Sequence, residues 1–131
     1  RIAFVRARNI YVINADGSGL QFVTQGLNPS WSPDGRSIVL DDGGWKLFTV
    51  DVNGSNRRAV YSKLPPASDP VWSPDGKEIV FSAIINLHET MHVDPESHLF
   101  RIKAGGGEPS MITARGQSYS LWFLKARRSR K

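Results

Sequence analysis

One seven-residue phrase occurs twice in the chain and constrains its fold more than any other feature. Residues 29–35 read Pro-Ser-Trp-Ser-Pro-Asp-Gly, and residues 70–76 read Pro-Val-Trp-Ser-Pro-Asp-Gly. The two tryptophans, Trp31 and Trp72, are 41 positions apart. A period of this length indicates a repeat architecture, in which each copy is one supersecondary unit that stacks on its neighbour.

Each copy of the phrase predicts the end of one strand, a tight turn and the start of the next strand. The serine before each proline is pushed toward an extended conformation. Pro-Asp-Gly then suits the central positions of a type I turn and the left-handed residue that follows it. The residues after the turn, 36–40 and 77–81, are rich in the branched and aromatic side chains that favour strands.

Aligned on this phrase, the chain shows three rounds of the same four strands, which we name inner, second, third and outer. The inner strands are expected at Trp31, at Trp72 and at residues 120–123, each of them closing a round. The other strands are expected at residues 1–5, 10–13, 20–24, 38–40, 46–50, 58–61, 79–82, 99–102 and 110–113. Short strands punctuated by Gly, Asn, Asp and Pro are typical of antiparallel hairpins, and four-stranded units at this spacing are β-propeller blades. The sequence therefore predicts an all-β fold of three four-stranded antiparallel blades with the tryptophans in the core between blades.

The predicted blades cover residues 1–124, with repeat breaks near residues 35 and 76, and residues 125–131 form a basic tail. This tail carries five of the 17 basic residues, and the remaining ones balance the 12 acidic residues, so the net charge of +5 comes from the tail. A body without basic bias predicts no nucleic-acid partner, and the tail is expected to be solvated. No apolar run reaches the roughly 18 residues of a membrane span, so no membrane insertion is expected.

The segments IYVINADGSG and NPSWSPDGRSIVL, with their second copies LFTVDVNGSN and DPVWSPDGKEIVF, resemble the repeats of TolB-type propellers. The resemblance covers roughly residues 1–123 and is partial for the third round. The family includes a periplasmic protein of cell-envelope complexes, and similar repeats occur in prolyl-oligopeptidase-like and tricorn-like peptidases. The resemblance implies about six blades in a closed ring, a periplasmic or secreted location, a protein partner and no cofactor. It carries over no catalytic residue.

The sequence offers few candidates for catalysis. Asp34 and Asp75 occupy matching turns, which account for both carboxylates. The chain has no Cys, and it contains neither a Gly-x-Ser-x-Gly elbow nor a phosphate-binding glycine loop. A non-enzymatic role is therefore expected.

A histidine-rich insertion in the third round, residues 88–98, contains the zinc-peptidase pattern His88-Glu89-x-x-His92 and a further histidine, His98. Two histidines four residues apart on a helix could share a zinc ion. The longer form of the pattern requires glycine where this chain has Pro95, which cannot adopt a positive φ. We therefore predict no metal site and keep zinc binding as a remote alternative.

Alternation of strand direction places two kinds of connection on opposite faces of the propeller. The Ser-Pro-Asp-Gly and glycine-rich turns share one face, and the longer, more varied connections share the other. Because variable loops on a rigid scaffold usually carry binding, the second face is the candidate site. The residues expected to contact a ligand there are Asp41, Asp42, Trp45, Asp69 and His88.

Three functions from different classes follow from this interpretation. The first is a non-enzymatic scaffold that binds a protein or another ligand, and the second is the substrate-gating propeller of a peptidase. The third is hydrolysis at the histidine cluster. Closed propellers usually have four to eight blades, so three blades predict either further blades in a longer chain or a homodimer that completes the ring. The absence of an initiator Met favours the longer chain.

Overall fold

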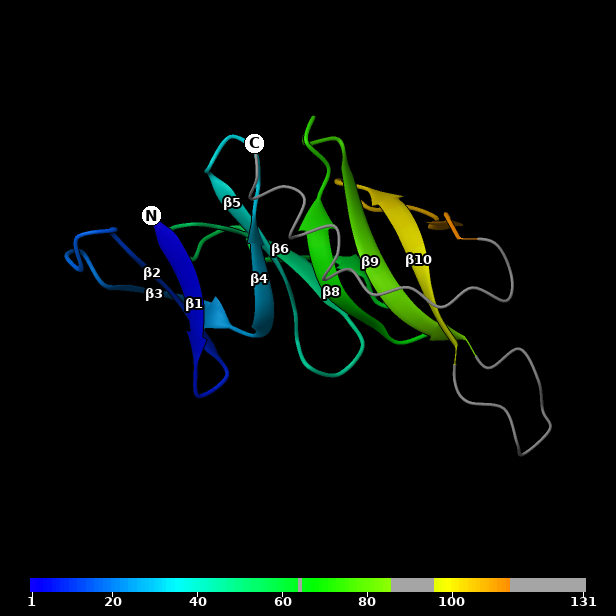
Figure 1. Cartoon of the computed structure of the whole chain (residues 1–131), viewed down its shortest axis with the longest axis horizontal. Coiled ribbons are helices and arrows are strands. Elements are labelled where there is room, and N and C mark those ends of the chain that lie inside the picture. The colour runs from blue at the N-terminus through cyan, green and yellow to red at the C-terminus, as the bar shows by residue number, and fades with distance from the viewer. Residues whose placement is uncertain (64, 86–95, 114–131) are drawn as a thin grey trace.

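A computed structural model describes residues 1–63, 65–85 and 96–113 of the chain. Within these ranges the secondary structure consists of strands, and the strands form three antiparallel sheets (Figure 1). Sheet A contains β1 (Ile2–Arg6), β2 (Asn9–Ile13) and β3 (Gln21–Gln25). Sheet B contains β4 (Leu27–Trp31), β5 (Ser37–Asp41), β6 (Leu47–Asp51) and β7 (Arg58–Tyr61). Sheet C contains β8 (Ala67–Trp72), β9 (Glu78–Ile85), β10 (Glu96–Lys103) and β11 (Ser110–Met111).

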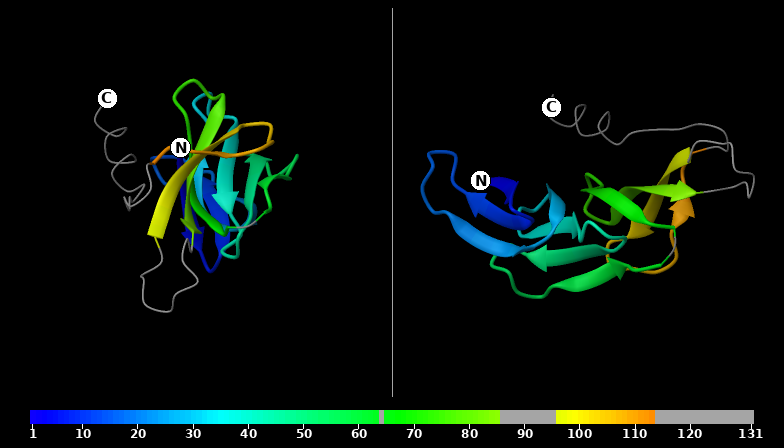
Figure 2. Two further views of the ribbon diagram at one scale, coloured as in Figure 1. Left: turned by 90° about the vertical axis from the view of Figure 1, so that its right-hand side faces the viewer. Right: turned by 90° about the horizontal axis from the view of Figure 1, so that it is seen from below.

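The three sheets follow one another in chain order and form an open row of blades rather than a closed ring (Figure 2). In sheets B and C the tryptophan-bearing strands, β4 and β8, lie at one edge and contact each other across the two blades. This confirms the predicted all-β propeller architecture with the tryptophan strands innermost. The described part of the chain contains no helix long and apolar enough to cross a membrane.

The repeated Ser-Pro-Asp-Gly turn is held by the same hydrogen bonds in both copies. The Ser32 hydroxyl donates to Asp34 Oδ1 at 2.6 Å, and the Arg36 N–H donates to the same oxygen at 3.0 Å. Gly35 takes the left-handed conformation, with φ of 70°. Ser73, Asp75 and Lys77 repeat this pattern with matching distances. The turns therefore account for both carboxylates, as the sequence predicts.

The pairing of the tryptophan strands corrects the predicted strand count of the first blade. Trp31 pairs with Ile38 and Trp72 with Ile79, so each tryptophan strand belongs to the sheet that follows it. The physical reason is the tight turn, which makes a hairpin with the strand after it. Sheet A consequently has three strands among the described residues instead of four. The sheets change at Gly26 and between β7 and β8, one strand before the turns near residues 35 and 76.

Most of the core of the described residues lies in two layers between neighbouring blades, and a smaller cluster of Val71 and Leu99 lies on sheet C. The layer between sheets A and B contains Ile10, Val12, Val23, Ile38, Leu40 and Val50, with Trp31 partly buried against it. The layer between sheets B and C contains Val39, Leu47, Tyr61, Phe81 and Phe100 among others, together with Trp72, which is 7% exposed. Both tryptophans thus pack in the gaps between blades, as predicted.

The passage from sheet A to sheet B depends on one glycine. Gly26 joins β3 directly to β4 with φ of 152°, a conformation that other residues rarely adopt. A Cβ at this position would lie 2.3 Å from the Leu40 side chain and 2.9 Å from the Asp41 carbonyl oxygen. The two blades can therefore approach this closely only with glycine at the crossing. The expected inner strand at residues 120–123 and the basic tail at residues 125–131 lie outside the described residues.

Candidate binding face

The connections between strands define two faces of the propeller. One side of the propeller is formed by residues 7–8, 26, 42–46 and the β7–β8 connection, and we call it the variable face. The opposite side, the uniform face, carries residues 14–20, 32–36, 52–57, 73–77 and 104–109. In the first blade the variable-face connections are tight, because β1 and β2 are joined by two residues and β3 and β4 by one.

Asp41, one of the predicted contact residues, is 2% exposed and joins three strands at the variable face. Its Oδ2 accepts a hydrogen bond from the Asn28 side-chain amide at 2.8 Å and from the Asp69 N–H at 3.2 Å. Its Oδ1 accepts from the Gly43 N–H at 3.0 Å. The carboxylate therefore ties β4, β5 and β8 together, and we regard Asp41 as a positioning residue of this face.

Asp69 lies in a backbone irregularity that repeats in the preceding blade. Asp69 has φ of 52° and Asn28 has φ of 49°. Each lies three positions before the repeat tryptophan and directly before a proline. The strand register shifts at both places, between Leu27 and Ser30 and between Ser68 and Val71. Sequence reasoning missed Asn28, although the shared Asx-Pro pair before each tryptophan carried the signal.

Asp42 organises the loop between β5 and β6. Its Oδ1 accepts hydrogen bonds from the N–H groups of Gly44, Trp45 and Lys46 at 2.9, 2.9 and 3.1 Å. Partial burial acts to raise the pKa of Asp42, but these three donors outweigh it, so the pKa lies below its ordinary value of 3.8. The ionised carboxylate therefore stabilises the loop through its Oδ1 atom.

Trp45 is the large apolar side chain that this loop presents to solvent. The residue is 56% exposed, and its carbonyl oxygen accepts a hydrogen bond from the Ala67 N–H at 3.5 Å. The loop is closed by a further backbone bond from the Asp42 N–H to the Lys46 carbonyl at 3.2 Å. An exposed ring on a backbone held at several points is preorganised for contact.

Arg8 joins the same face and was missed by sequence reasoning. It lies in the two-residue β1–β2 turn, where Ala7 and Arg8 both have positive φ, 49° and 62°. Its Nη2 donates to the Asp42 carbonyl at 3.0 Å, and its own carbonyl accepts from the Gly26 N–H at 2.9 Å. The structure thus brings Asp41, Asp42, Trp45 and Asp69 to one face and adds Arg8 and Asn28 to them.

The histidine-rich stretch is described only at its end. His88, Glu89 and His92 lie outside the described residues, so the predictions for ligand contact by His88 and for metal binding are not tested by the structure. His98 is fully buried on β10, with Nδ1 3.2 Å from the Thr113 hydroxyl. Within the described ranges no three His, Cys, Asp or Glu side chains gather in a way that could hold a metal ion.

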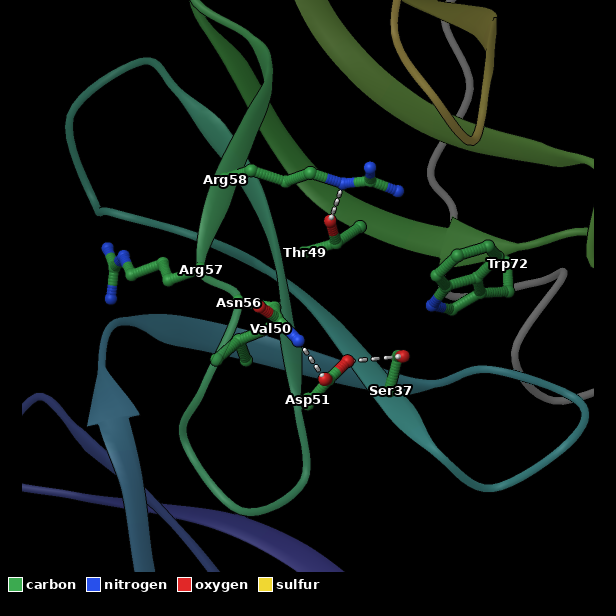
Figure 3. Close-up of a pocket in the computed structure, with 8 residues that line it drawn as sticks. All are labelled: Ser37, Thr49, Val50, Asp51, Asn56, Arg57, Arg58 and Trp72. Carbon is green, nitrogen blue, oxygen red and sulfur yellow. Dashed lines mark hydrogen bonds between the residues drawn. The ribbon is translucent and has the colours of Figure 1, made fainter.

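A cavity of about 500 Å³ lies on the uniform face, between sheets B and C. Figure 3 shows Ser37, Thr49, Asp51, Asn56, Arg58 and Trp72 around it. The buried indole N–H of Trp72 has no hydrogen-bond partner among the described residues. The Asp51 carboxylate accepts hydrogen bonds from the Asn56 side-chain amide at 2.7 Å and from the Ser37 hydroxyl at 3.4 Å.

Comparisons with known proteins agree with the repeats and the blades. The chain matches none of the protein-family models. It is 39% identical over 64 residues to the Tol-Pal system protein TolB of Rhizorhabdus wittichii, a match that covers 43% of this chain and 15% of that protein. A TolB-type structure from Agrobacterium tumefaciens superimposes with a TM-score of 0.67 at 21% identity, covering 85% of this chain and 43% of that one. Acylaminoacyl peptidase from Pyrococcus horikoshii superimposes with a TM-score of 0.63 at 15% identity, covering 82% of this chain and 21% of that one.

The sheets, the inner tryptophan strands and the structural likenesses define the chain as a β-propeller scaffold of incomplete extent. Its repeats are of the TolB type, as the likeness to the Tol-Pal relatives shows. The chain spans about one seventh of the length of these curated relatives within the matched segment.

Proposed function

We propose that this chain is part of a non-enzymatic propeller that binds a protein partner through its variable face. The observation that carries the proposal is the Trp45 ring, which is exposed on a loop held by the Asp42 carboxylate and by Ala67. Tryptophan is enriched among the residues that dominate interface energetics, and a preformed loop loses little entropy on binding. The relatives named Tol-Pal system protein TolB support a protein partner. The resemblance of the repeats to the TolB type supports a cell-envelope complex and a periplasmic location.

The contact residues of this proposal are Asp42, Trp45, Asp69 and His88, with Asp41 as a positioning residue. Asp41 contributes by holding β4, β5 and β8 in place, since its carboxylate is buried. The proposal includes no cofactor and no metal. The ring would be completed by further blades of a longer polypeptide or by a second copy of the chain.

The propeller part of a peptidase is the second candidate, and the likeness to acylaminoacyl peptidase motivates it. In such a protein the propeller controls access to an active site in another domain. A likeness at 15% identity supports the fold alone, and the sequence contains no nucleophile motif. A hydrolase domain elsewhere in the full-length polypeptide would favour this candidate over the interaction scaffold.

The test of the proposed function is a titration of the chain with the purified Pal component of the Rhizorhabdus wittichii Tol-Pal system. We expect Trp45→Ala to weaken binding at least about 10-fold, because truncating a central aromatic removes much of an interface's free energy. Leu20→Ala is the matched control, since Leu20 is similarly exposed at 59% but lies on the uniform face. Equal binding by Trp45→Ala and the unchanged chain, or no binding by either, would overturn the proposal.

A further inference from the structure

A second cavity lies between sheets A and B at the variable face and shares one lining residue, Arg57, with the cavity in Figure 3. Its volume is about 350 Å³. Most of its lining comes from the β1–β2 turn, the β3–β4 junction and the start of the β5–β6 loop, with one side chain from the segment before β7. The lining residues are Ala7, Arg8, Asn9, Gln25, Gly26, Asp42 and Arg57.

Two arginines line this cavity, and neutral groups hold both in place. Arg8 donates to the Asp42 carbonyl at 3.0 Å. Arg57 donates through Nη1 to the Thr24 hydroxyl and to the Gln25 carbonyl, the latter at 2.6 Å. Its guanidinium also lies 4.3 Å from the centre of the Phe48 ring. Because a guanidinium has five N–H donors, these contacts orient both groups and leave several donors for a ligand.

The described residues provide no carboxylate that pairs with either arginine, since the ion pairs there join Lys63 to Glu108 and Arg101 to Glu78. Asp42 is the acidic residue that lines the cavity, and its Oδ1 already accepts three backbone N–H groups of its own loop. The positive charge of the cavity is therefore not balanced by a direct contact within the described residues.

The gap between sheets B and C contains an ion pair where the gap between sheets A and B contains two arginines. Lys63 lies two residues after β7, in the region where Gly26 follows β3, and Glu108 lies two residues before β11, in the region where Arg57 precedes β7. The two gaps therefore correspond by region and not residue by residue. Between sheets B and C the two side chains carry opposite charges and form an ion pair. Two cations around one cavity repel each other, so the gap between sheets A and B is arranged less favourably for the chain alone. Such a departure from local stability is typical of binding sites.

We propose that the cavity between Arg8 and Arg57 binds a carboxylate of the protein partner, supplied by an aspartate or glutamate side chain. Planar guanidinium groups match carboxylate geometry and bind it through paired hydrogen bonds. The inference rests on the proposed function, since it names the chemistry that a partner on the variable face presents next to Trp45. It makes acidic segments of the partner the specific ligands of this face.

The test is a calorimetric and NMR titration of the chain with the peptide acetyl-Gly-Glu-Gly-Glu-Gly-amide. The matching glutamine peptide and inorganic phosphate are titrated in parallel. We expect the glutamate peptide to bind and to shift the amide signals of Asn9 and Gly26. The glutamine peptide should bind at least about 10-fold more weakly, because a loss of charge pairing lowers affinity by this order. Phosphate, which carries the charge without the peptide chain, should bind no more tightly than the glutamate peptide.

Variants locate the binding. Arg8→Gln and Arg57→Gln should each weaken glutamate-peptide binding at least about 10-fold, and Arg8→Lys should fall between Arg8→Gln and the unchanged chain. Arg58→Gln is the matched control, because it removes the same charge from the next residue. Figure 3 shows Arg57 and Arg58 leaving the chain in opposite directions, and Arg58 donates to Thr49 at 3.4 Å. If Arg57→Gln fails to fold, Arg8→Gln and Arg8→Lys carry the test.

An equal loss on Arg58→Gln, equal binding of the glutamine peptide, tighter binding of phosphate, or no peptide binding would each overturn the proposal. Its failure is distinguishable from failure of the proposed function. Glutamate-peptide binding that depends on Arg8, without any binding of the Pal component, would support the carboxylate site and refute the proposed partner. Binding of the Pal component that depends on Trp45 but not on Arg8 would support the proposed function and refute the carboxylate site.

Discussion

At the scale of single residues, the aspartates of the repeated turns show how a local hydrogen bond becomes a pH dependence. The Ser32 hydroxyl and the Arg36 N–H hold the pKa of Asp34 below its ordinary value of 3.8, and Ser73 and Lys77 do the same for Asp75. A carboxylate whose pKa is lower in the folded state stabilises the fold above its unfolded-state pKa. That stabilisation is lost as the pH falls through the lower, folded-state pKa.

We therefore expect the free energy of unfolding to decrease as the pH falls below about 4, where unfolded aspartates take up protons. The double variant Asp34→Asn/Asp75→Asn should lose less stability over the same interval, because it has two fewer such carboxylates. Urea unfolding between about pH 6 and about pH 2 measures both slopes. Parallel curves for the variant and the unchanged chain would show that these turns contribute nothing to the acid dependence.

The tryptophans give a second prediction at this scale, based on burial. Trp72 is 7% exposed within the core layer of sheets B and C, whereas Trp45 is 56% exposed on its loop. Trp72→Ala should reduce the free energy of unfolding by about 3–5 kcal/mol, the usual cost of removing a large buried aromatic. Trp45→Ala should change it by no more than about 0.5 kcal/mol. Urea unfolding compares the two, and the opposite ranking would mean that core and binding face are exchanged.

At the scale of elements, the first strand differs from its counterparts in the next two blades. The pairing of Ile2 with Ile13, Ile38 with Val50 and Ile79 with Ile102 makes the three isoleucines equivalent. Ile38 and Ile79 are fully buried, and each pairs with a tryptophan of the inner strand. Ile2 is 53% exposed, and within the described residues β1 pairs with β2 alone. The inner edge of sheet A is therefore open.

We expect this edge to accept an extended peptide by strand addition. A peptide with the sequence of residues 67–74, Ala-Ser-Asp-Pro-Val-Trp-Ser-Pro, should raise the thermal midpoint of the chain with increasing peptide concentration, because it binds the folded state. The same peptide with alanine in place of tryptophan should have little effect. Ile2→Lys should abolish the stabilisation. Stabilisation that persists in Ile2→Lys would place the peptide at another edge.

At the scale of the whole molecule, three blades leave the outward side of sheet A without a neighbouring blade among the described residues. Phe4, Tyr11 and Phe22 form a row of rings on this side, with successive centroids 5.7 Å apart. Ile2 and Phe22 are exposed there. In the other blades the equivalent of this side, with Ile38 and Leu40 or Ile79 and Phe81, is packed on the preceding sheet. Exposed apolar patches of this kind mark interfaces or cause aggregation.

The isolated chain is accordingly not expected to persist as a monomer at micromolar concentration. It should form a soluble dimer that closes a ring of blades, because each apolar side gains a partner in this way. The titrations and unfolding experiments then refer to this dimer. Size exclusion coupled to light scattering measures the mass, and Phe22→Lys should shift the population toward monomer. A stable, monodisperse species near 14.6 kDa would contradict the expectation.

The sequence by itself determined the features that depend on local chemistry. Strand spacing, the two Ser-Pro-Asp-Gly turns and the burial of Trp72 follow from backbone preferences and from side chains close together along the chain. The repeat also allowed the variable face and four of its residues, Asp41, Asp42, Trp45 and Asp69, to be predicted. Local alternation of strand direction is sufficient for that assignment.

Only the tertiary structure decided what those residues do and which others join them. Asp41 is a buried link because Asn28 and Asp69 reach it from two other strands, 13 and 28 positions away. Arg8 and Arg57 share a cavity because sheets A and B pack closely at Gly26. These contacts depend on how one blade is placed on the next, and that placement results from the packing of a whole apolar layer, which no short sequence pattern encodes.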